Sequence, residues 1–265
     1  MKTRIISALI MTLLFVPLLF IGGQYFKIVV SILGVFATRE LLNSKGKSIS
    51  KIFKIIAYIF TFILIYISKD LLDYRLVMLF LLIILIIPLF TKEKEFNVED
   101  AFFIISAVLL TSLPLRYFLT LRLERLGLAI YLVLIPIITD SFAYITGNLI
   151  GRHKLIEKIS PNKTVEGAVG GFVAASIFCT IFYVVVINHH TNIVIALLST
   201  MFLSIISQLG DLVFSSIKRY FNIKDFSKLI PGHGGILDRI DSLIFVIIGY
   251  SILILGGLIW IYYIF

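Results

Sequence analysis

Apolar and polar residues follow one another in long blocks along this chain. A helix that crosses a membrane needs about 20 mostly apolar residues, and lipid admits helices but no open sheet. Nine such runs stand out, at positions 5–23, 25–42, 52–67, 75–90, 101–119, 126–146, 167–188, 193–215 and 243–265. The pattern therefore predicts an all-α, polytopic integral membrane protein with about nine transmembrane helices.

The composition agrees with a protein that lies in a membrane. Of the 265 residues, 60% are hydrophobic and 15% are charged, whereas a soluble domain has about 45–50% apolar and about 25% charged residues. A water-soluble fold has no means of burying so much apolar surface. An ordinary globular enzyme and a disordered chain are thereby excluded, and the one cysteine, Cys179, excludes a disulfide scaffold.

Positive charges are divided unequally between the two sides that nine spans define. One side receives 18 of the 24 Lys and Arg residues and the other receives 6. Because positive residues stay in the cytoplasm, we expect the N-terminus and the two longest loops, 147–166 and 216–242, on the cytoplasmic face of the cell's inner (plasma) membrane. The C-terminus then lies outside, with Trp260, Tyr262 and Tyr263 in the interfacial aromatic belt. The net charge of +9 is thus explained by topology, without a nucleic-acid partner.

Acidic residues inside apolar runs are the first candidates for function. Asp140 and Asp211 lie in the sixth and eighth runs, and a carboxylate in a bilayer usually faces a cavity or a partner. Around Asp211 polar residues recur every three or four positions, which places them on one helix face. They are Thr200, Ser204, Ser207, Asp211, Ser215 and Lys218. For the serines alone, the favoured alternative is that they join helices by hydrogen bonds.

The loop at 216–242 combines glycines, cations and acids. Its run Gly232-His-Gly-Gly235 leaves the backbone open, so that N–H groups can point at an anion. The cations suited to phosphates are Lys218, Arg219, Lys224, Lys228 and Arg239. Asp238 and Asp241 among them indicate a hard metal such as Mg²⁺, held by one or two carboxylates and by substrate phosphates. The alternative, an interfacial segment that meets anionic lipid, explains the lysines but not the glycine run.

The loop at 147–166 has a similar composition. Ser160-Pro161 predicts a turn into a helix, and Lys163-Thr164 then lies where a nucleotide phosphate would bind. The spacing of a P-loop is missing, and plain helix capping is an equal alternative. Arg39 and Glu40, at the end of the second run, predict a local interfacial ion pair.

A long composite motif occupies the C-terminal half. It reads Ser215-x-Ile-Lys-Arg-x4-Lys-Asp-x-Ser-x2-Ile-Pro-x-His-Gly-Gly-Ile-x-Asp-Arg-Ile-Asp241. Upstream stand Asp140-Ser-Phe-Ala-Tyr144-x2-Gly147-x3-Gly151-Arg152, Ser160-Pro-x-Lys-Thr164-x-Glu-Gly167 and Gln208-Leu-Gly-Asp211-Leu. Together these resemble the phosphatidate cytidylyltransferases, the CDP-diacylglycerol synthases. The N-terminal half matches that family only as generic spans.

The resemblance implies a reaction of CTP with phosphatidate that gives CDP-diacylglycerol and pyrophosphate. It also implies Mg²⁺ as cofactor, with a second metal or a monovalent ion left open, and a homodimer surrounded by membrane lipid. One membrane-embedded unit is expected, in which N-terminal helices at 1–125 precede a catalytic region at 126–265.

The resemblance also implies roles for individual residues, with Asp211 and Asp238 as the metal ligands. The implied catalytic residues are Asp211, Asp238, Lys218, Arg219, His233, Arg239 and Asp241. The implied substrate-binding residues are Asp140, Tyr144, Ser160, Lys163, Thr164, Glu166, Ser215, Lys224, Asp225, Gly234 and Gly235.

Three positions depart from the family pattern. Phe214 stands where the family has Glu, Phe226-Ser227 replaces Ser-Gly, and Asn162 replaces Lys. The acids of the motif remain, so we expect an active enzyme.

An ion-coupled transporter stays open as an alternative, but it has no need for long basic loops. A nearer alternative is another CTP-using lipid enzyme, such as a polyprenol kinase or an archaeal-lipid cytidylyltransferase.

Overall fold

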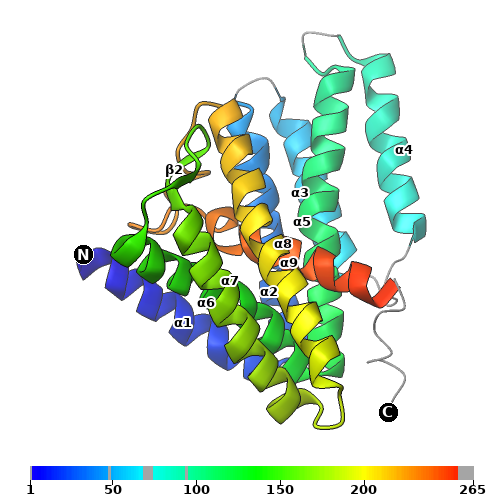
Figure 1. The fold of residues 1–265 in the computed structure, drawn as a ribbon. Coiled ribbons are helices and arrows are strands. Elements are labelled where there is room, and N and C mark those ends of the chain that lie inside the picture. Colours follow the sequence, from blue (N-terminus) through cyan, green and yellow to red (C-terminus); the bar gives the residue numbers. More distant parts are fainter. Residues whose placement is uncertain (1, 47–48, 68–73, 93–94, 256–265) are drawn as a thin grey trace. The chain divides into compact units, whose positions relative to one another are not determined.

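The computed structural model describes residues 2–46, 49–67, 74–92 and 95–255, which form helices and one small hairpin (Figure 1). By its internal contacts the chain divides into two compact units. The first comprises Met1–Glu124 and Phe221–Arg239, and the second comprises Arg125–Tyr220 and Ile240–Phe265. The aromatic belt expected at Trp260, Tyr262 and Tyr263 lies outside the described residues.

The first unit is built from five helices of the N-terminal half. They are α1 (Lys2–Ile21), α2 (Gly23–Ser44), α3 (Lys51–Tyr66), α4 (Tyr74–Phe90) and α5 (Val98–Glu124). Helices α2, α3 and α5 pack against one another, α1 packs against α2, and α4 packs against α5. At the centre the hydroxyl of Thr38 lies 3.0 Å from that of Thr61 and 2.7 Å from that of Thr111. These buried hydroxyls join three helices in surroundings that offer no water.

The second unit contains the helices that follow. They are α6 (Leu126–Ile150), α7 (Val165–Phe182) with a π-helical turn (Tyr183–Ile187), α8 (Ile193–Tyr220) and the part of α9 (Leu237–Leu255) from Ile240 onward. Helices α6, α7 and α8 pack against one another. Glycines on α7 allow close approach to α6: a Cβ on Gly167 would lie 2.6 Å from the carbonyl oxygen of Ala143.

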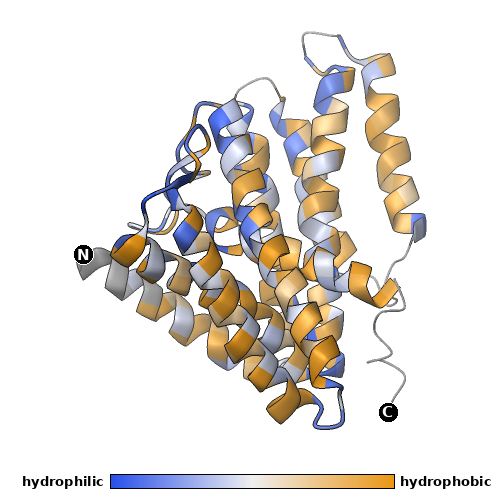
Figure 2. Ribbon diagram, in the orientation of Figure 1, coloured by the Kyte–Doolittle hydropathy of each residue, from blue (hydrophilic) through white to orange (hydrophobic). Residues whose placement is uncertain are grey.

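Four helices of the described part of the chain are long and apolar enough to cross a membrane. They are α5, α6, α7 with its π-helical turn, and α8. Figure 2 shows hydrophobic residues along α6 and α7 and hydrophilic ones at the hairpin between them. The expectation of a helical membrane protein is thereby confirmed, whereas the number of nine spans is not.

Helices α6 and α8 are among those that continue beyond the ends that the apolar runs predict. Helix α6 ends at Ile150 and α8 at Tyr220, not at 146 and 215. Hydropathy marks where apolar residues stop, but the helical hydrogen bonds continue into polar ones. In α8 the last turn contains Lys218 and Arg219, and cations are favourable at a helix C-terminus.

The segment between α6 and α7 differs from expectation. It forms an antiparallel hairpin of β1 (Lys154–Ile156) and β2 (Ser160–Thr164), in which Lys154 pairs with Thr164. The helix start predicted at Ser160-Pro161 is therefore wrong, because these residues belong to β2. Thr164 caps α7 instead, since its hydroxyl accepts a hydrogen bond from the N–H of Gly167 at 3.1 Å.

Candidate active site

Asp211 on α8 is held by two side chains of the second unit. Its Oδ2 lies 2.5 Å from Nζ of Lys163, and its Oδ1 accepts a hydrogen bond from the hydroxyl of Ser215 at 3.2 Å. Lys163 belongs to β2, so the hairpin brings an expected phosphate-binding lysine to an expected metal ligand. The two side chains keep 27% and 25% of their surface exposed, and the pair is therefore within reach of a ligand.

Other predicted residues of the second unit gather near Asp211. Asp241 is buried and lies close enough to Asp211, Asp140 and Lys218 to interact with them electrostatically. Lys218 is also buried, whereas Asp140 and Tyr144 are exposed on α6. The structure thus places three carboxylates and a buried lysine in one electrostatic neighbourhood.

The polar stripe of α8 serves two purposes along its length. Thr200 lies 2.8 Å from the hydroxyl of Tyr131, and Ser204 lies 3.0 Å from the hydroxyl of Thr139, both on α6. In this part the stripe joins helices, as the alternative for the hydroxyl residues predicts. Only its C-terminal part reaches Asp211 and the basic residues.

Glu166 shapes the turn between α6 and β1. Its carboxylate accepts hydrogen bonds from the backbone N–H groups of Arg152 and His153, at 3.1 and 3.2 Å, and lies 2.6 Å from Nδ1 of His153. Arg219, on α8, donates from Nε to the carbonyl of Ile159 at 3.2 Å. Arg219 therefore contacts the turn of the hairpin that carries Lys163, while Glu166 holds the two residues before it, and Ser160 is the first residue of β2.

In the first unit, Asp238 is held by the backbone of the loop that precedes it. Its Oδ2 accepts hydrogen bonds from the N–H groups of Phe226 and Gly235, at 3.0 and 2.9 Å. Gly234 adopts a φ of +83°, which favours glycine because a Cβ is strained there. The loop thus folds around a carboxylate that is almost completely buried.

His233 contacts α1. Its Nδ1 lies 2.7 Å from the hydroxyl of Ser7, which itself donates to the carbonyl of Pro231 at 3.0 Å. Ser7 thus joins His233 and the backbone of Pro231 to α1. The remaining predicted residues of this loop, Lys224, Asp225 and Arg239, are exposed.

The glycine run and the two residues after it bind carboxylates of the protein itself. The N–H of Gly235 donates to Asp238, and the next two N–H groups, of Ile236 and Leu237, donate to Glu40 of α2. Glu40 was expected to pair with Arg39, and sequence reasoning missed its role. No local signal marks it, because its partners lie almost two hundred positions away.

The acids of the site offer hard oxygen ligands for a metal. In the described part of the chain, no group of three or more His, Cys, Asp or Glu side chains is arranged to hold a metal ion. Mg²⁺ is usually bound by one or two carboxylates together with substrate phosphates. Asp211 and Asp238 each supply carboxylate oxygens of that kind, and Asp211 keeps 25% of its side chain exposed.

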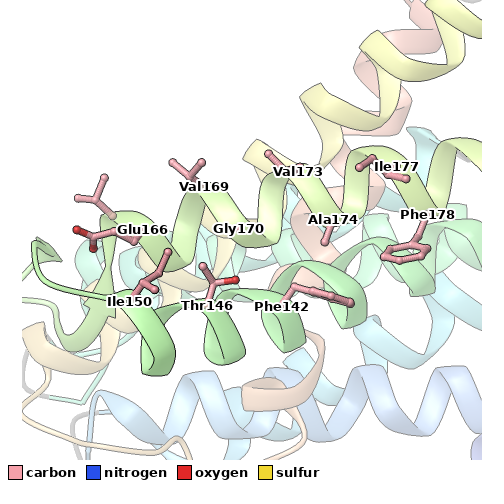
Figure 3. Close-up of a pocket in the computed structure, with 11 residues that line it drawn as sticks. Phe142, Thr146, Ile150, Glu166, Val169, Gly170, Val173, Ala174, Ile177 and Phe178 are labelled. Carbon is pink, nitrogen blue, oxygen red and sulfur yellow. The ribbon is translucent and has the colours of Figure 1, made fainter.

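An apolar groove of about 640 Å³ runs between α6 and α7 (Figure 3). Figure 3 shows Glu166 near one end of it and Phe142 and Phe178 at the other. Val169 and Val173 lie along its length. A groove with this lining offers a hydrocarbon chain a surface that begins beside the hairpin.

At two of the positions that depart from the family pattern, 214 and 226, the structure has a buried aromatic ring. Phe214 is completely buried on α8, and its ring meets that of Phe245 edge-on at 6.0 Å between centroids. Phe226 is buried as well, and its backbone N–H is one of the two that hold Asp238.

Known proteins resemble this chain over nearly its whole length. The model of the cytidylyltransferase family matches residues 2–255. A protein of Staphylococcus haemolyticus named phosphatidate cytidylyltransferase is 37% identical over 262 residues, which cover 96% of this chain and 99% of that protein. Proteins of the same name from Staphylococcus epidermidis and Staphylococcus aureus are 36% and 34% identical, with the same coverage. The chain therefore belongs to the cytidylyltransferase family.

Proposed function

We propose that this protein transfers the cytidylyl group of CTP to phosphatidate, which gives CDP-diacylglycerol and pyrophosphate. The observation that carries the proposal is the similarity to phosphatidate cytidylyltransferases, at 34–37% identity over 96% of the chain. The acids and cations placed around Asp211 and Asp238 are the groups that such a reaction needs.

In the proposed reaction, an oxygen of the phosphatidate phosphate attacks the α-phosphorus of CTP. The bond between that phosphorus and the oxygen that bridges to the β-phosphate breaks, and pyrophosphate leaves with the electron pair. Negative charge gathers on the phosphates, so positioned cations stabilise the transition state. Lys163, Lys218 and Arg219 are the cations of the second unit that would do so.

Mg²⁺ is the proposed cofactor, with Asp211 and Asp238 as its ligands. When bound, it would offset charge on the triphosphate and on the leaving pyrophosphate. Lys163 would then exchange its contact with Asp211 for one with a phosphate, because an ammonium ion and a metal compete for the same carboxylate. The groove between α6 and α7 would accept an acyl chain of the lipid.

The proposed topology has nine spans in the inner membrane, with the N-terminus and both long loops in the cytoplasm and the C-terminus outside. It can be tested with Cys179 replaced by Ser and one new cysteine introduced, either at Lys158 or at His189. A membrane-impermeant maleimide added to intact cells should label the cysteine at 189 and leave the one at 158 unlabelled.

The proposed homodimer can be tested by the mass of the protein in lipid nanodiscs.

The activity is tested with the purified full chain in lipid nanodiscs, supplied with radiolabelled CTP, phosphatidate and Mg²⁺. A labelled CDP-lipid is expected, and no product is expected when EDTA removes the metal. A polyprenol and an archaeal ether-lipid phosphate, offered separately, should give no product. If one of these is used and phosphatidate is not, the assignment of the lipid substrate fails.

A further inference from the structure

Glu40 is a buried carboxylate of α2 that contacts the loop before α9. Its side chain is 4% exposed. Oε1 accepts hydrogen bonds from the hydroxyl of Ser227 at 2.6 Å and from the N–H of Ile236 at 3.0 Å, while Oε2 accepts from the N–H of Leu237 at 2.7 Å. A carboxylate is buried at acceptable cost only when donors surround it, and Glu40 has three of them within one unit.

The hydrogen bonds of Glu40 fix the start of α9. Leu237 is the first residue of that helix, and the first N–H groups of a helix have no partner within it. The carboxylate of Glu40 supplies one, at the end of the helix where negative charge is favourable. Asp238, the proposed metal ligand, is the next residue, so the contact also fixes the backbone from which that ligand projects.

Gly235 leaves the space that Glu40 occupies. A Cβ at this position would lie 2.6 Å from Oε1 of Glu40, closer than real Cβ atoms come to other atoms. The φ angle of Gly235 is not in the left-handed region, so the need for glycine arises from this carboxylate. Glu40 and Gly235 are therefore coupled sterically, and the N–H of Gly235 at the same time holds Asp238.

We propose that Glu40 is a positioning residue of the reaction: from α2 it holds Ser227 and the 236–237 backbone, and thereby sets the position of Asp238. The inference rests on the proposed function in so far as Asp238 takes part in it. It gives the N-terminal half a contact to the loop that the family motif specifies.

The first test replaces Glu40 with Ala and with Gln in the full chain in nanodiscs. Removal of a group that orients a metal ligand typically costs about 10- to 100-fold in metal affinity or activity. For Glu40→Ala we expect kcat about 100-fold lower and a Mg²⁺ concentration for half-maximal rate about 10-fold higher. Glu40→Gln keeps one acceptor oxygen for Ser227 and Ile236, and its loss should be about 10-fold.

Asp100→Asn is the matched control. Asp100 is another buried carboxylate of the first unit, paired with Lys45 at 2.6 Å and remote in sequence from the loop. Its loss should lower the Tm at least as much as Glu40→Gln does and leave kcat and the Mg²⁺ dependence of the folded protein unchanged. If Glu40→Ala lowers Tm but its folded fraction has normal kcat and Mg²⁺ dependence, Glu40 is merely structural and the inference is overturned.

Hydrogen exchange separates this inference from the proposed function, because it needs no turnover. In Glu40→Ala, backbone amides at 226–238 should exchange faster than in the unaltered protein, and in Asp100→Asn they should not. If the unaltered protein makes no CDP-lipid but this change is seen, the proposed function fails while the anchoring by Glu40 stands. Unchanged exchange in Glu40→Ala refutes the anchoring whatever the activity.

The coupling to Gly235 offers a further variant. Gly235→Ala in the unaltered protein should lower kcat about 100-fold, because the added Cβ meets the carboxylate and displaces the loop. In the Glu40→Ala background the same change should cost only a few-fold, since the space is then vacant. Equal losses in both backgrounds would contradict the coupling.

Discussion

Two carboxylates of the proposed site, Asp238 and Asp211, are held in opposite ways. Asp238 accepts hydrogen bonds from two backbone N–H groups of the loop before it, and the neighbouring N–H groups are held by Glu40. Asp211 instead contacts side chains, the ammonium of Lys163 and the hydroxyl of Ser215. One carboxylate is fixed by main chain, while the partners of the other can rotate away.

The difference indicates that Asp238 is held rigidly, whereas Asp211 can change its partners. Backbone donors move only if the loop moves, so we expect Asp238 to keep its geometry when substrate binds. A lysine side chain has several rotatable bonds and exchanges partners readily, so the pair of Lys163 and Asp211 can open when a triphosphate and a metal arrive. The following variants test this contrast.

The largest effect is expected when either carboxylate loses its charge. Asp238→Asn and Asp211→Asn should each lower the rate of CDP-lipid formation by about 10³-fold or more, at the upper end of what a lost electrostatic contact to a transition state costs. Both proteins should still insert into the membrane, which is measured by their yield and Tm. A near-normal rate in either variant would remove that residue from the metal site.

A carboxylate introduced at the buried position 214 should disrupt the fold. Phe214→Glu restores the residue that the family pattern has, but here it replaces a fully buried ring packed on Phe245. A charge that replaces a buried ring loses its hydration, so we expect a lower yield of folded protein and a lower Tm. A gain of activity at unchanged Tm would mean that α8 admits a second acid.

Lengthening each acid by one methylene tests how rigidly it is held. Asp238→Glu should lower kcat about 100-fold, because the carboxylate moves by about 1 Å out of its backbone donors. Asp211→Glu should cost only about 10-fold, since Lys163 and Ser215 can follow the longer side chain. Equal losses would contradict the contrast between a fixed and an adaptable carboxylate.

The smallest effect is expected at the lysine. Lys163→Gln keeps a donor beside Asp211 but removes the charge, and we expect KM for CTP about 10-fold higher with kcat reduced only a few-fold. The reason is that binding of the nucleotide would lose one cation while others remain. Lys154→Gln, on the exposed neighbouring strand, is the control and should leave KM unchanged; Lys154 donates to the carbonyl of Pro161.

Much of the architecture could be predicted from periodicity alone. Long apolar runs identified the helices because each must satisfy its backbone hydrogen bonds internally. The spacing of Thr200, Ser204, Asp211 and Ser215 correctly predicted one shared face. The ends of α6 and α8 were missed because hydropathy does not register a helix that continues into polar residues.

The contacts that shape the site were beyond the sequence because they join distant segments. The pairing of β1 with β2 depends on register within a polar stretch that carries no alternating pattern, so a loop was the natural expectation. The carboxylates that take up the N–H groups of the glycine run were also unforeseen, since composition shows that such a run binds an anion without showing which one. Glu40 looked like half of a local ion pair because its true donors are remote.

The contact between Glu40 and the loop also has a meaning for biosynthesis. Glu40 leaves the ribosome 187 residues before Ser227 and 197 before Leu237. Throughout the insertion of α3 to α8, the nascent chain therefore carries an acid whose donors have not yet been made. Glu40 receives its hydrogen bonds only when the loop and the start of α9 have been synthesised. The folding of the loop and the final packing of α2 therefore occur together, late in translation.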